Sequence, residues 1–488
     1  MFSNLRQSLL AGRARPGAAG GSPALILAII LGCYLMVVLD ASIVITALPS
    51  IHSDLHISPT GLSWVQNAYT LTFGGLLLLG ARAGDLLGRR QVFVAGILLF
   101  TFASALGGLA QSPAWLLGAR ALQGVGAAVA APSTLALLTV SFPQGHERIR
   151  ALAYYSGVAG AGVSIGLVLG GMLTSWASWR WGLFINVPIG IILAWLAPRH
   201  LPETERHSGR FDLAGALTST LGMTGLVFGL VRAADSGWGD DLALGSFAAA
   251  AVLLTAFVVT ERRVEQPITP LRLFASRERV GAYAARMLTV GAMFGMFFFL
   301  TQFMQGAEGY SALGAGAAFL PVSLSVFAMV RVVPRLVPRF GELRVLIGGL
   351  TLALIGLAWL SRIGVDSNYA TQVAPPMMLL GIGMGSAFTP LTSLGIAGVS
   401  DHDAGAASGV VNAAHQLGGT LGIGILITVF ASASHGSSAS ALAEGVPTAI
   451  TASAVLVALA LVVTLTVMRP AARTVRRLSP SGLRTTNG

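Results

Sequence analysis

Residues 24–48 read ALILAIILGCYLMVVLDASIVITAL, a mainly apolar run that contains one charged residue, Asp40. About 20 such residues cross a bilayer, and a charged side chain at the membrane centre costs roughly 2.5–3.5 kcal/mol on insertion scales. A carboxylate retained at that cost usually binds a ligand, and its simplest ligand is a proton. The run therefore predicts a transmembrane helix with Asp40 as a proton-binding residue; a purely structural acid is the alternative.

The composition of the whole chain predicts a polytopic membrane protein. Of its 488 residues, 54% are hydrophobic and 10% are charged, whereas soluble domains carry about 25% charged residues. All 30 basic residues are Arg, and they give a net charge of +11. They lie in short loops and at both ends, without an aromatic–basic stripe, so we expect no nucleic-acid partner. The single Cys33 excludes an intramolecular disulfide.

Fourteen apolar runs are long enough to span a membrane, which predicts an all-α polytopic membrane protein. The sixth run is short, and we expect Pro188 to interrupt it. The runs lie near residues 24–48, 62–81, 91–110, 114–139, 151–173, 181–197, 213–232, 242–260, 281–304, 312–333, 343–361, 374–398, 406–431 and 447–468.

The distribution of arginines predicts the orientation. With both termini in the cytoplasm, 25 of the 30 arginines fall on the cytoplasmic side, as the positive-inside rule requires. The first apolar run exceeds the core of about 7–15 residues found in a signal peptide, so we expect a retained first span. The use of Arg alone, with abundant Ala and Gly, is typical of a GC-rich genome. The expected location is the cytoplasmic (inner) membrane of a bacterium.

Two loop-and-helix segments resemble each other. GRRQVFVAG (88–96) follows the second run and GELRVLIGG (341–349) follows the tenth, with glycines at matching ends. This pattern fits two parallel six-helix halves with two extra helices between them, a repeat architecture of transporters. We predict a cytoplasmic N-terminal tail (1–23), an N-terminal six-helix bundle (24–200), two linker helices (201–280), a C-terminal six-helix bundle (281–468) and a cytoplasmic C-terminal tail (469–488).

Arg120, in the fourth run, lies at a depth that matches Asp40. With a rise of 1.5 Å per residue, Asp40 is about 24 Å and Arg120 about 21 Å from the cytoplasmic edge of a core about 30 Å thick. An ion pair between them would lower the cost of both charges, and protonation of Asp40 would release Arg120. The alternative is that Arg120 snorkels toward the outer surface.

The loop GARAGDLLGRR (80–90) joins the second and third runs. Gly80 permits close helix approach, and Asp85 suits the positive N-terminus of a neighbouring helix. Arg89 and Arg90 can pair with carboxylates or lipid phosphates. Together with Gly88, these residues predict a conformational latch; a basic loop that only sets the topology is the alternative.

Three glycines recur at intervals of four residues in the fifth run, Gly162, Gly166 and Gly170. This spacing is typical of a helix face on which another helix packs closely. The pattern alone leaves open whether the packing is static or allows the two helices to slide.

Four motifs together resemble the fourteen-helix drug:proton antiporter branch of the major facilitator superfamily. They are LDASIVITALP (39–49), GDLLGRR (84–90), RALQGVGAA (120–128) and SWRWGLFINVPIG (178–190), and the likeness covers nearly the whole chain apart from its two tails. The resemblance implies a major facilitator fold and an exporter of drugs or antibiotics that exchanges them for protons. It implies that Asp40 is the proton-binding carboxylate, that Arg120 is its partner, and that Asp85 and Arg89 belong to the latch.

Two positions depart from the family pattern. The fifth run has Leu167 after Gly166, where the family often has a proline linked with antiport. The thirteenth run has His415 before Gln416, where the family often has Arg. His415 either titrates near physiological pH or is a neutral packing residue.

The substrate cavity of such a transporter lies near the membrane midplane between the two halves. Aromatic and Met side chains there would suit variable, hydrophobic or amphipathic ligands, and the single deep acid favours neutral or weakly charged ones. We expect Arg286 to snorkel to the membrane surface, with guidance of an anion as the alternative. The candidate lining residues are Asn67, Tyr69, Gln123, Phe294, Phe298, Gln302, Asn412 and His415.

The leading hypothesis is therefore a proton-driven exporter of hydrophobic or amphipathic compounds. Proton-coupled uptake of a small metabolite and a non-transporting membrane receptor are the alternatives. An enzyme is not expected, because the chain has no nucleophile–base constellation and no metal-ligand cluster. It has no Walker-type motif either, so we expect the proton gradient, and no cofactor, to supply the energy. We expect a monomer in the lipid bilayer.

Overall fold

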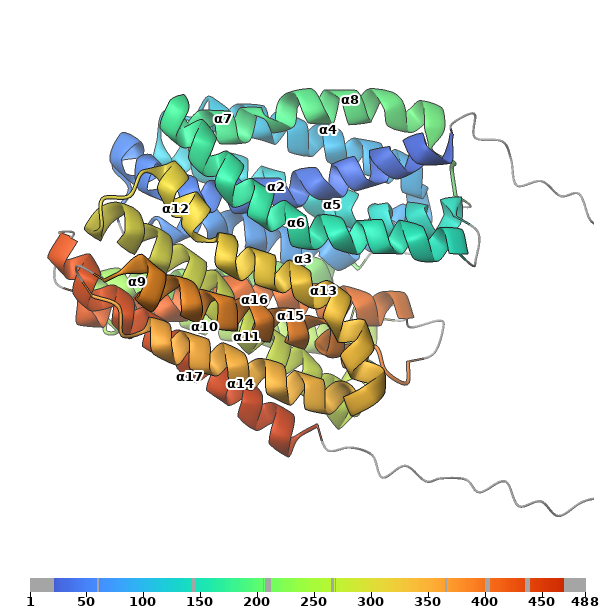
Figure 1. The fold of residues 1–488 in the computed structure, drawn as a ribbon. Coiled ribbons are helices and arrows are strands. Elements are labelled where there is room, and N and C mark those ends of the chain that lie inside the picture. The colour runs from blue at the N-terminus through green and yellow to red at the C-terminus, as the bar shows by residue number, and fades with distance from the viewer. Residues whose placement is uncertain are drawn as a thin grey trace, which may run out of the picture.

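A computed structural model describes residues 22–58, 61–142, 146–204, 206, 212–264, 267, 269–364, 367–399, 404–434 and 439–468. Within these residues every regular element is helical (Figure 1). Thirteen helical stretches are long and apolar enough to cross a membrane, and a shorter apolar stretch, Gly162–Trp176, lies in the fifth predicted run. The prediction of an all-α membrane fold is confirmed.

Each of the fourteen predicted runs corresponds to one helix or to two consecutive helical pieces. The N-terminal elements are α2 (Pro23–Leu55), α3 (Ser63–Leu87), α4 (Arg89–Gly108), α5 (Pro113–Ser141), α6 (His146–Trp176), α7 (Trp179–Phe184) and α8 (Asn186–His200). Two further helices follow, α9 (Leu213–Ser236) and α10 (Asp241–Arg263). The C-terminal elements are η1 (Leu271–Ala275), α11 (Arg277–Gln302), η2 (Phe303–Ala307), α12 (Ala312–Ala318), α13 (Leu320–Phe340), α14 (Glu342–Leu360), η3 (Tyr369–Val373), α15 (Ala374–Gly395), α16 (Ala404–Ala433) and α17 (Ala439–Thr466).

The helix that carries Asp40 is longer than its apolar run predicts. It starts at Pro23 behind the N-cap Ser22, whose hydroxyl accepts from the Leu25 backbone N–H, and it continues through Pro49 to Leu55. Ser at the N-cap and Pro at the first helical position are favourable there. Asp40 therefore lies in the interior of a 33-residue helix.

The sixth run is interrupted just before Pro188, because a proline cannot donate to the carbonyl four residues earlier, here that of Phe184, the last residue of α7. The break falls at Ile185, between α7 and α8. Pro188 lies in the first turn of α8, where backbone N–H groups have no partner within the helix and the missing proline N–H costs little. The break turns Asn186 into the first residue of α8.

The predicted internal repeat has a backbone counterpart. Gly88 lies between α3 and α4 with φ +101°, and Gly341 lies between α13 and α14 with φ +85°. Glycine adopts these left-handed conformations without the steric penalty of a Cβ. The two halves therefore make the same sharp turn with the same residue type.

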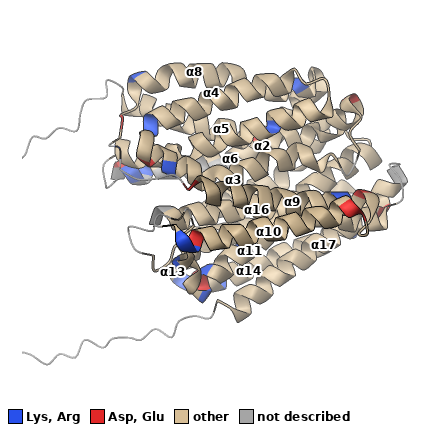
Figure 2. Cartoon of the chain, turned by 180° about the vertical axis from the view of Figure 1, so that it is seen from behind, with Lys and Arg blue, Asp and Glu red and all other residues tan. Residues whose placement is uncertain are grey.

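The chain folds into two groups of helices that pack along a central seam (Figure 1). Across the seam, α3 packs against α16, and α6 packs against α12 and α13. The extra helix α9 contacts both α3 and α16, and α10 packs on α9. Figure 2 shows that charged residues gather mainly toward the ends of the helices, which leaves the middle of the bundle largely uncharged, as a membrane requires.

Candidate functional site

Asp40 and Arg120 form an ion pair in the interior of the N-terminal half. The Arg120 Nη1 atom of α5 lies 2.5 Å from the Asp40 Oδ2 atom of α2, and both side chains are fully buried. The equal depths estimated from the sequence agree with this contact. The alternative in which Arg120 snorkels to the surface is wrong, because its guanidinium points inward to the carboxylate.

Asp40 receives two more hydrogen bonds from side-chain amides. The Nε2 atom of Gln123 and the Nδ2 atom of Asn186 each donate to Asp40 Oδ1 at 2.9 Å. Gln123 Nε2 also donates to the Ser104 hydroxyl at 2.7 Å. All the groups that reach Asp40 are donors, so the arrangement matches a deprotonated carboxylate. We call Asp40, Ser104, Arg120, Gln123 and Asn186 the Asp40 cluster.

Arg120 is held in place by more than its carboxylate partner. Its Nε atom donates to the Val65 carbonyl at 3.1 Å, and Nη1 also donates to Gln123 Oε1 at 2.9 Å. The guanidinium lies over the Tyr69 ring, with its carbon 4.4 Å from the ring centroid. Tyr69 and Gln123, two of the candidate cavity residues, therefore lie against the ion pair.

Two members of the Asp40 cluster were not singled out from the sequence. Ser104 reaches the cluster through Gln123, and Asn186 reaches it directly from α8. Asn186 is part of the motif at 178–190 that carries the family resemblance, and it is the polar residue that follows the helix break. A polar amide side chain next to a break in an apolar run is the sequence feature that could have identified Asn186 as a site residue.

The glycine stripe of α6 packs against α2 on both sides of Asp40. A Cβ atom on Gly162 would lie 2.8 Å from Val38 Cγ1, and one on Gly166 would lie 2.6 Å from Ser42 Cβ. One on Gly170 would lie 2.7 Å from the Ile43 Cα atom. Because no side chain fits between the two helices here, α6 follows α2 closely over the segment that carries the acid.

Two of the predicted latch residues are in contact with each other. Asp85 and Arg89 form an ion pair one helical turn apart, across the boundary between α3 and α4. Arg89 Nη1 also donates to the Ala81 carbonyl at 3.1 Å. A Cβ on Gly80 would lie 2.0 Å from the Ala128 carbonyl oxygen, so this glycine permits the close approach of α3 and α5.

The acid at the N-terminus of α4 is Glu203 and not Asp85. Glu203 Oε1 accepts from the Arg90 backbone N–H at 3.2 Å, and its other oxygen pairs with the Arg90 side chain at 3.4 Å. The Arg89 backbone N–H donates to the Thr204 hydroxyl at 3.0 Å. The chain that follows α8 thus occupies the positive end of α4, next to Gly88, where a Cβ would lie 2.7 Å from Glu203 Oε1.

A second buried arginine, Arg286 of α11, lies in the C-terminal half. Its side chain does not snorkel, since the residue is 9% exposed, and that prediction is wrong. Nη1 donates to the Thr392 hydroxyl at 2.8 Å, and Nη2 lies 3.5 Å from His415 Nδ1. Since a guanidinium only donates, the His415 nitrogen that faces it acts as an acceptor. The guanidinium carbon lies 5.6 Å from the centroid of the Phe388 ring.

The other predicted cavity residues do not form one group. Phe294 packs edge-on against His415, with ring centroids 6.1 Å apart. Asn67 and Phe298 are buried, Gln302 is 9% exposed, and Asn412 is exposed. Both polar side-chain atoms of Asn67 are buried without a hydrogen-bond partner. The structure thus brings together Phe294 and His415, and it separates both of them from Tyr69 and Gln123.

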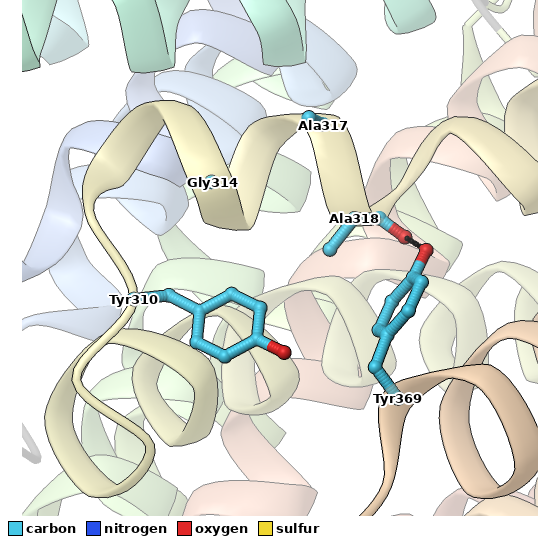
Figure 3. A pocket seen from close by; sticks show the side chains of 5 residues that line it. All are labelled: Tyr310, Gly314, Ala317, Ala318 and Tyr369. Atoms are coloured by element: carbon cyan, nitrogen blue, oxygen red, sulfur yellow. Dashed lines mark hydrogen bonds between the residues drawn. The ribbon is translucent and has the colours of Figure 1, made fainter.

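Two of the hollows in the described part of the molecule contain no predicted cavity residue. The larger, of about 240 Å³, is lined by Tyr310, Gly314, Ala317, Ala318 and Tyr369. Figure 3 shows the Tyr310 and Tyr369 rings below α12, with the Tyr369 hydroxyl donating to the Ala318 carbonyl at 2.9 Å. The smaller, of about 170 Å³, lies beside Trp64 and Phe228.

The fold and the buried ion pair between its helices define a multi-pass membrane transporter. The chain matches the model of the Major Facilitator Superfamily over residues 30–423, and it belongs to this family. Solved structures with 12–16% identity share only the fold. The nucleoside transporter NupG has a TM-score of 0.64, covering 91% of this chain and 100% of that one. A bacterial homologue of the lysosomal transporter Spinster has a TM-score of 0.64, covering 92% and 100%.

Three similar proteins are named for antibiotic resistance or export. The puromycin resistance protein pur8 of Streptomyces alboniger is 42% identical over 86% of this chain and 85% of its own length. The cephamycin export protein CmcT of Amycolatopsis lactamdurans is 41% identical over 88% and 90%. The tetracenomycin C resistance and export protein of Streptomyces glaucescens is 33% identical over 83% and 76%.

Proposed function

We propose that this protein exports hydrophobic or amphipathic drugs or antibiotics across the bacterial cytoplasmic membrane in exchange for protons. The observation that carries the proposal is the fully buried Asp40–Arg120 pair in the middle of the N-terminal half. The names of the relatives, which include resistance and export proteins, support the direction and the kind of cargo. Both termini would face the cytoplasm, and a monomer would suffice.

Protonation of Asp40 is the step that would couple the gradient to movement. A neutral carboxyl no longer attracts Arg120 by charge, and its O–H must find an acceptor among neighbours that are now all donors to it. The set of hydrogen bonds in the Asp40 cluster must therefore rearrange. A ligand shifts a conformational equilibrium only through its different affinity for the two states, and this rearrangement supplies that difference for the proton.

The packing around Asp40 would carry the rearrangement to other helices. On one side, α2 is in close contact with the glycine stripe of α6, and α6 in turn packs against α12 and α13 across the seam. A change in position of α2 would thus reach the C-terminal half through α6. This route is consistent with alternating access, in which one half rocks against the other around a central site.

Everted membrane vesicles with an imposed pH gradient test the proposal. We expect Asp40→Asn to remove gradient-driven uptake of a drug into such vesicles while the protein still inserts at normal amounts. Asp54→Asn is the matched control, because Asp54 lies on the same helix but pairs with Arg180 at a partly exposed position. Normal gradient-driven transport by the Asp40→Asn protein would overturn the assigned role of this residue.

The direction of flux in the same vesicles separates the remaining alternatives. An exporter accumulates drug inside everted vesicles as protons leave them, whereas a proton-coupled importer extrudes a preloaded solute. A receptor moves neither, and its activity would survive Asp40→Asn.

A further inference from the structure

Arg286 is a buried positive charge for which the described part of the chain supplies no negative partner. The ion pairs formed by the described residues leave it out, and its close polar neighbours are the Thr392 hydroxyl and the His415 ring. Arg120, which is buried as well, has a carboxylate at 2.5 Å. An ionised group taken out of water is costly unless it is paired, so an unpaired buried arginine calls for a ligand.

The free hydrogen-bond donors of Arg286 lie on one edge of its guanidinium. The Nε atom is buried and has no hydrogen-bond partner, and Nη2 has only the 3.5 Å contact with His415. The Nη1 atom is already engaged by Thr392. The Nε and Nη2 donors of an arginine are parallel, and this edge matches the two oxygens of a carboxylate.

The surroundings of this edge suit the apolar body of a small molecule. Phe388 lies under the guanidinium, and its ring centroid is 5.9 Å from that of His415. Phe294 also packs edge-on against His415. Thr392, the anchor of Nη1, is exposed, so the guanidinium lies beside accessible surface.

Arg286 also lies where the two halves face each other. The phenol of Tyr34, on α2, is within electrostatic reach of its charge, and Tyr34 stacks on Tyr155 of α6 with ring centroids 4.0 Å apart. Next to His415, Gln416 contacts Gly74 of α3. This is the position between the bundles at which transporters of this architecture hold their cargo.

We propose that Arg286 binds a carboxylate on the cargo, so that the preferred substrates are amphipathic monoanions with an aromatic or otherwise apolar body. The Nε–Nη2 edge holds the carboxylate, Thr392 fixes the orientation of the guanidinium, and Phe294 and Phe388 contact the apolar part. This assignment replaces the expectation of neutral cargo. It rests on the proposed function only for the claim that the bound compound is transported, because binding is measured separately.

Matched fluorescent probes test the assignment. Dansylglycine carries a carboxylate, and dansylglycinamide has the same body without the charge. The full-length protein is placed in nanodiscs of zwitterionic lipid, and the binding of each probe is followed by dansyl fluorescence. We expect the wild type to bind the acid about 10- to 100-fold more tightly than the amide, as a hydrogen bond to a charged group implies.

Arg286→Gln should remove the preference for the acid and leave amide binding unchanged. Arg286→Lys should keep part of the preference, because it retains the charge but not the parallel donors. Arg331→Gln is the matched control: Arg331 also lies over a phenylalanine, Phe327, but it is exposed, and the preference should remain. Thr392→Val tests the anchor and should reduce the preference without affecting the amide.

Three results would overturn the assignment. They are equal binding of acid and amide by the wild type, an acid preference that survives Arg286→Gln, and no saturable binding of the acid at concentrations below about 1 mM, which corresponds to about 4 kcal/mol of binding free energy. The binding assay is independent of transport. A protein that binds the acid through Arg286 but moves nothing would contradict the proposed function alone, and export without dependence on Arg286 would contradict this inference alone.

Discussion

Arg120 and Arg286 are two buried arginines in the two halves of one molecule, and they differ in what neutralises them. Each lies over an aromatic ring, Tyr69 at 4.4 Å and Phe388 at 5.6 Å. Arg120 has Asp40 within its own half, whereas Arg286 has a hydroxyl and an imidazole. The chain thus neutralises its buried arginine in the N-terminal half with its own carboxylate. Among the described residues, Arg286 in the C-terminal half has no such carboxylate.

Under the two proposals, the two steps of exchange would take place at separate sites. A proton would act on the Asp40 cluster, and an anionic cargo would act on Arg286. The two sites share α2, which carries both Asp40 and Tyr34, and this helix would be the element that links them. Coupling between two ligands needs such a shared element with two arrangements.

Removal of each arginine in turn gives the largest expected contrast. Arg120→Ala leaves Asp40 buried without its cation, and breaking a buried pair in this way costs about 3–5 kcal/mol of stability. Arg286→Ala removes an unpaired buried charge and should leave stability unchanged or higher. Thermal unfolding of both variants in detergent, followed by tryptophan fluorescence, measures the contrast.

The double variant Asp40→Asn/Arg120→Ala is the control for that experiment. It should recover much of the stability lost by Arg120→Ala, because no unpaired charge is left, and it should still fail to export. Equal destabilisation by Arg120→Ala and Arg286→Ala would contradict the distinction between a paired and an unpaired arginine.

A smaller effect is expected at the contact between α2 and α6. Gly166→Ala forces a methyl group to within 2.6 Å of Ser42 Cβ, and such overpacking costs about 1–3 kcal/mol. Export should fall together with stability, while the preference for dansylglycine over its amide, which depends on the C-terminal half, should persist. Gly118→Ala is the control, since nothing lies within 4 Å of a Cβ there. Loss of the acid preference in Gly166→Ala would show that the two sites are not separable.

The smallest effect is expected at a third arginine, which is paired but partly exposed. Arg232 holds the carboxylate of Asp240 through two hydrogen bonds of 3.0 Å, and these lower the pKa of Asp240 below its ordinary value of 3.8. The pair stabilises the fold above that ordinary value, and the contribution is lost as the pH falls through the lowered pKa. Exposed pairs contribute little.

Asp240→Asn should therefore lower the unfolding temperature slightly at neutral pH and not at all in strong acid, where the wild-type carboxyl is protonated as well. Unfolding curves of the two proteins at both pH values measure this. A shift as large as that of Arg120→Ala would mean that burial is not what separates the three arginines.

The sequence predicted the Asp40–Arg120 contact because two opposite charges inside apolar runs are stable only if they pair with each other or reach the membrane surface. Their depths follow from helix rise alone, and each lowers the cost of the other. The sequence did not predict that Asn186 joins them, because this depends on where the sixth run breaks, and the break falls at Ile185, ahead of the proline. It also did not predict that Glu203 covers the start of α4, since a loop residue is positioned by contacts distant in the chain.

The candidate cavity residues stay a prediction, and the structure places them at several separate positions. Tyr69, Gln123, Phe294 and His415 all lie in spans at plausible depth, but depth does not reveal which way a side chain points around the helix axis. Tyr69 and Gln123 face Arg120 and Asp40, whereas Phe294 faces His415. The prediction that Arg286 snorkels failed because depth does not give the direction of a side chain. An arginine near the end of an apolar run can reach either the membrane surface or the protein interior.

By itself, the sequence determined that this chain crosses a membrane many times and where it turns. It also determined which charges must be accommodated in the apolar interior. These features follow from the free energy of transfer from water to lipid, which each residue contributes locally along the chain. The rotation of each helix and the meeting of α2, α5 and α8 around one carboxylate were decided by the tertiary structure alone. These features depend on packing between distant segments, which no local pattern encodes.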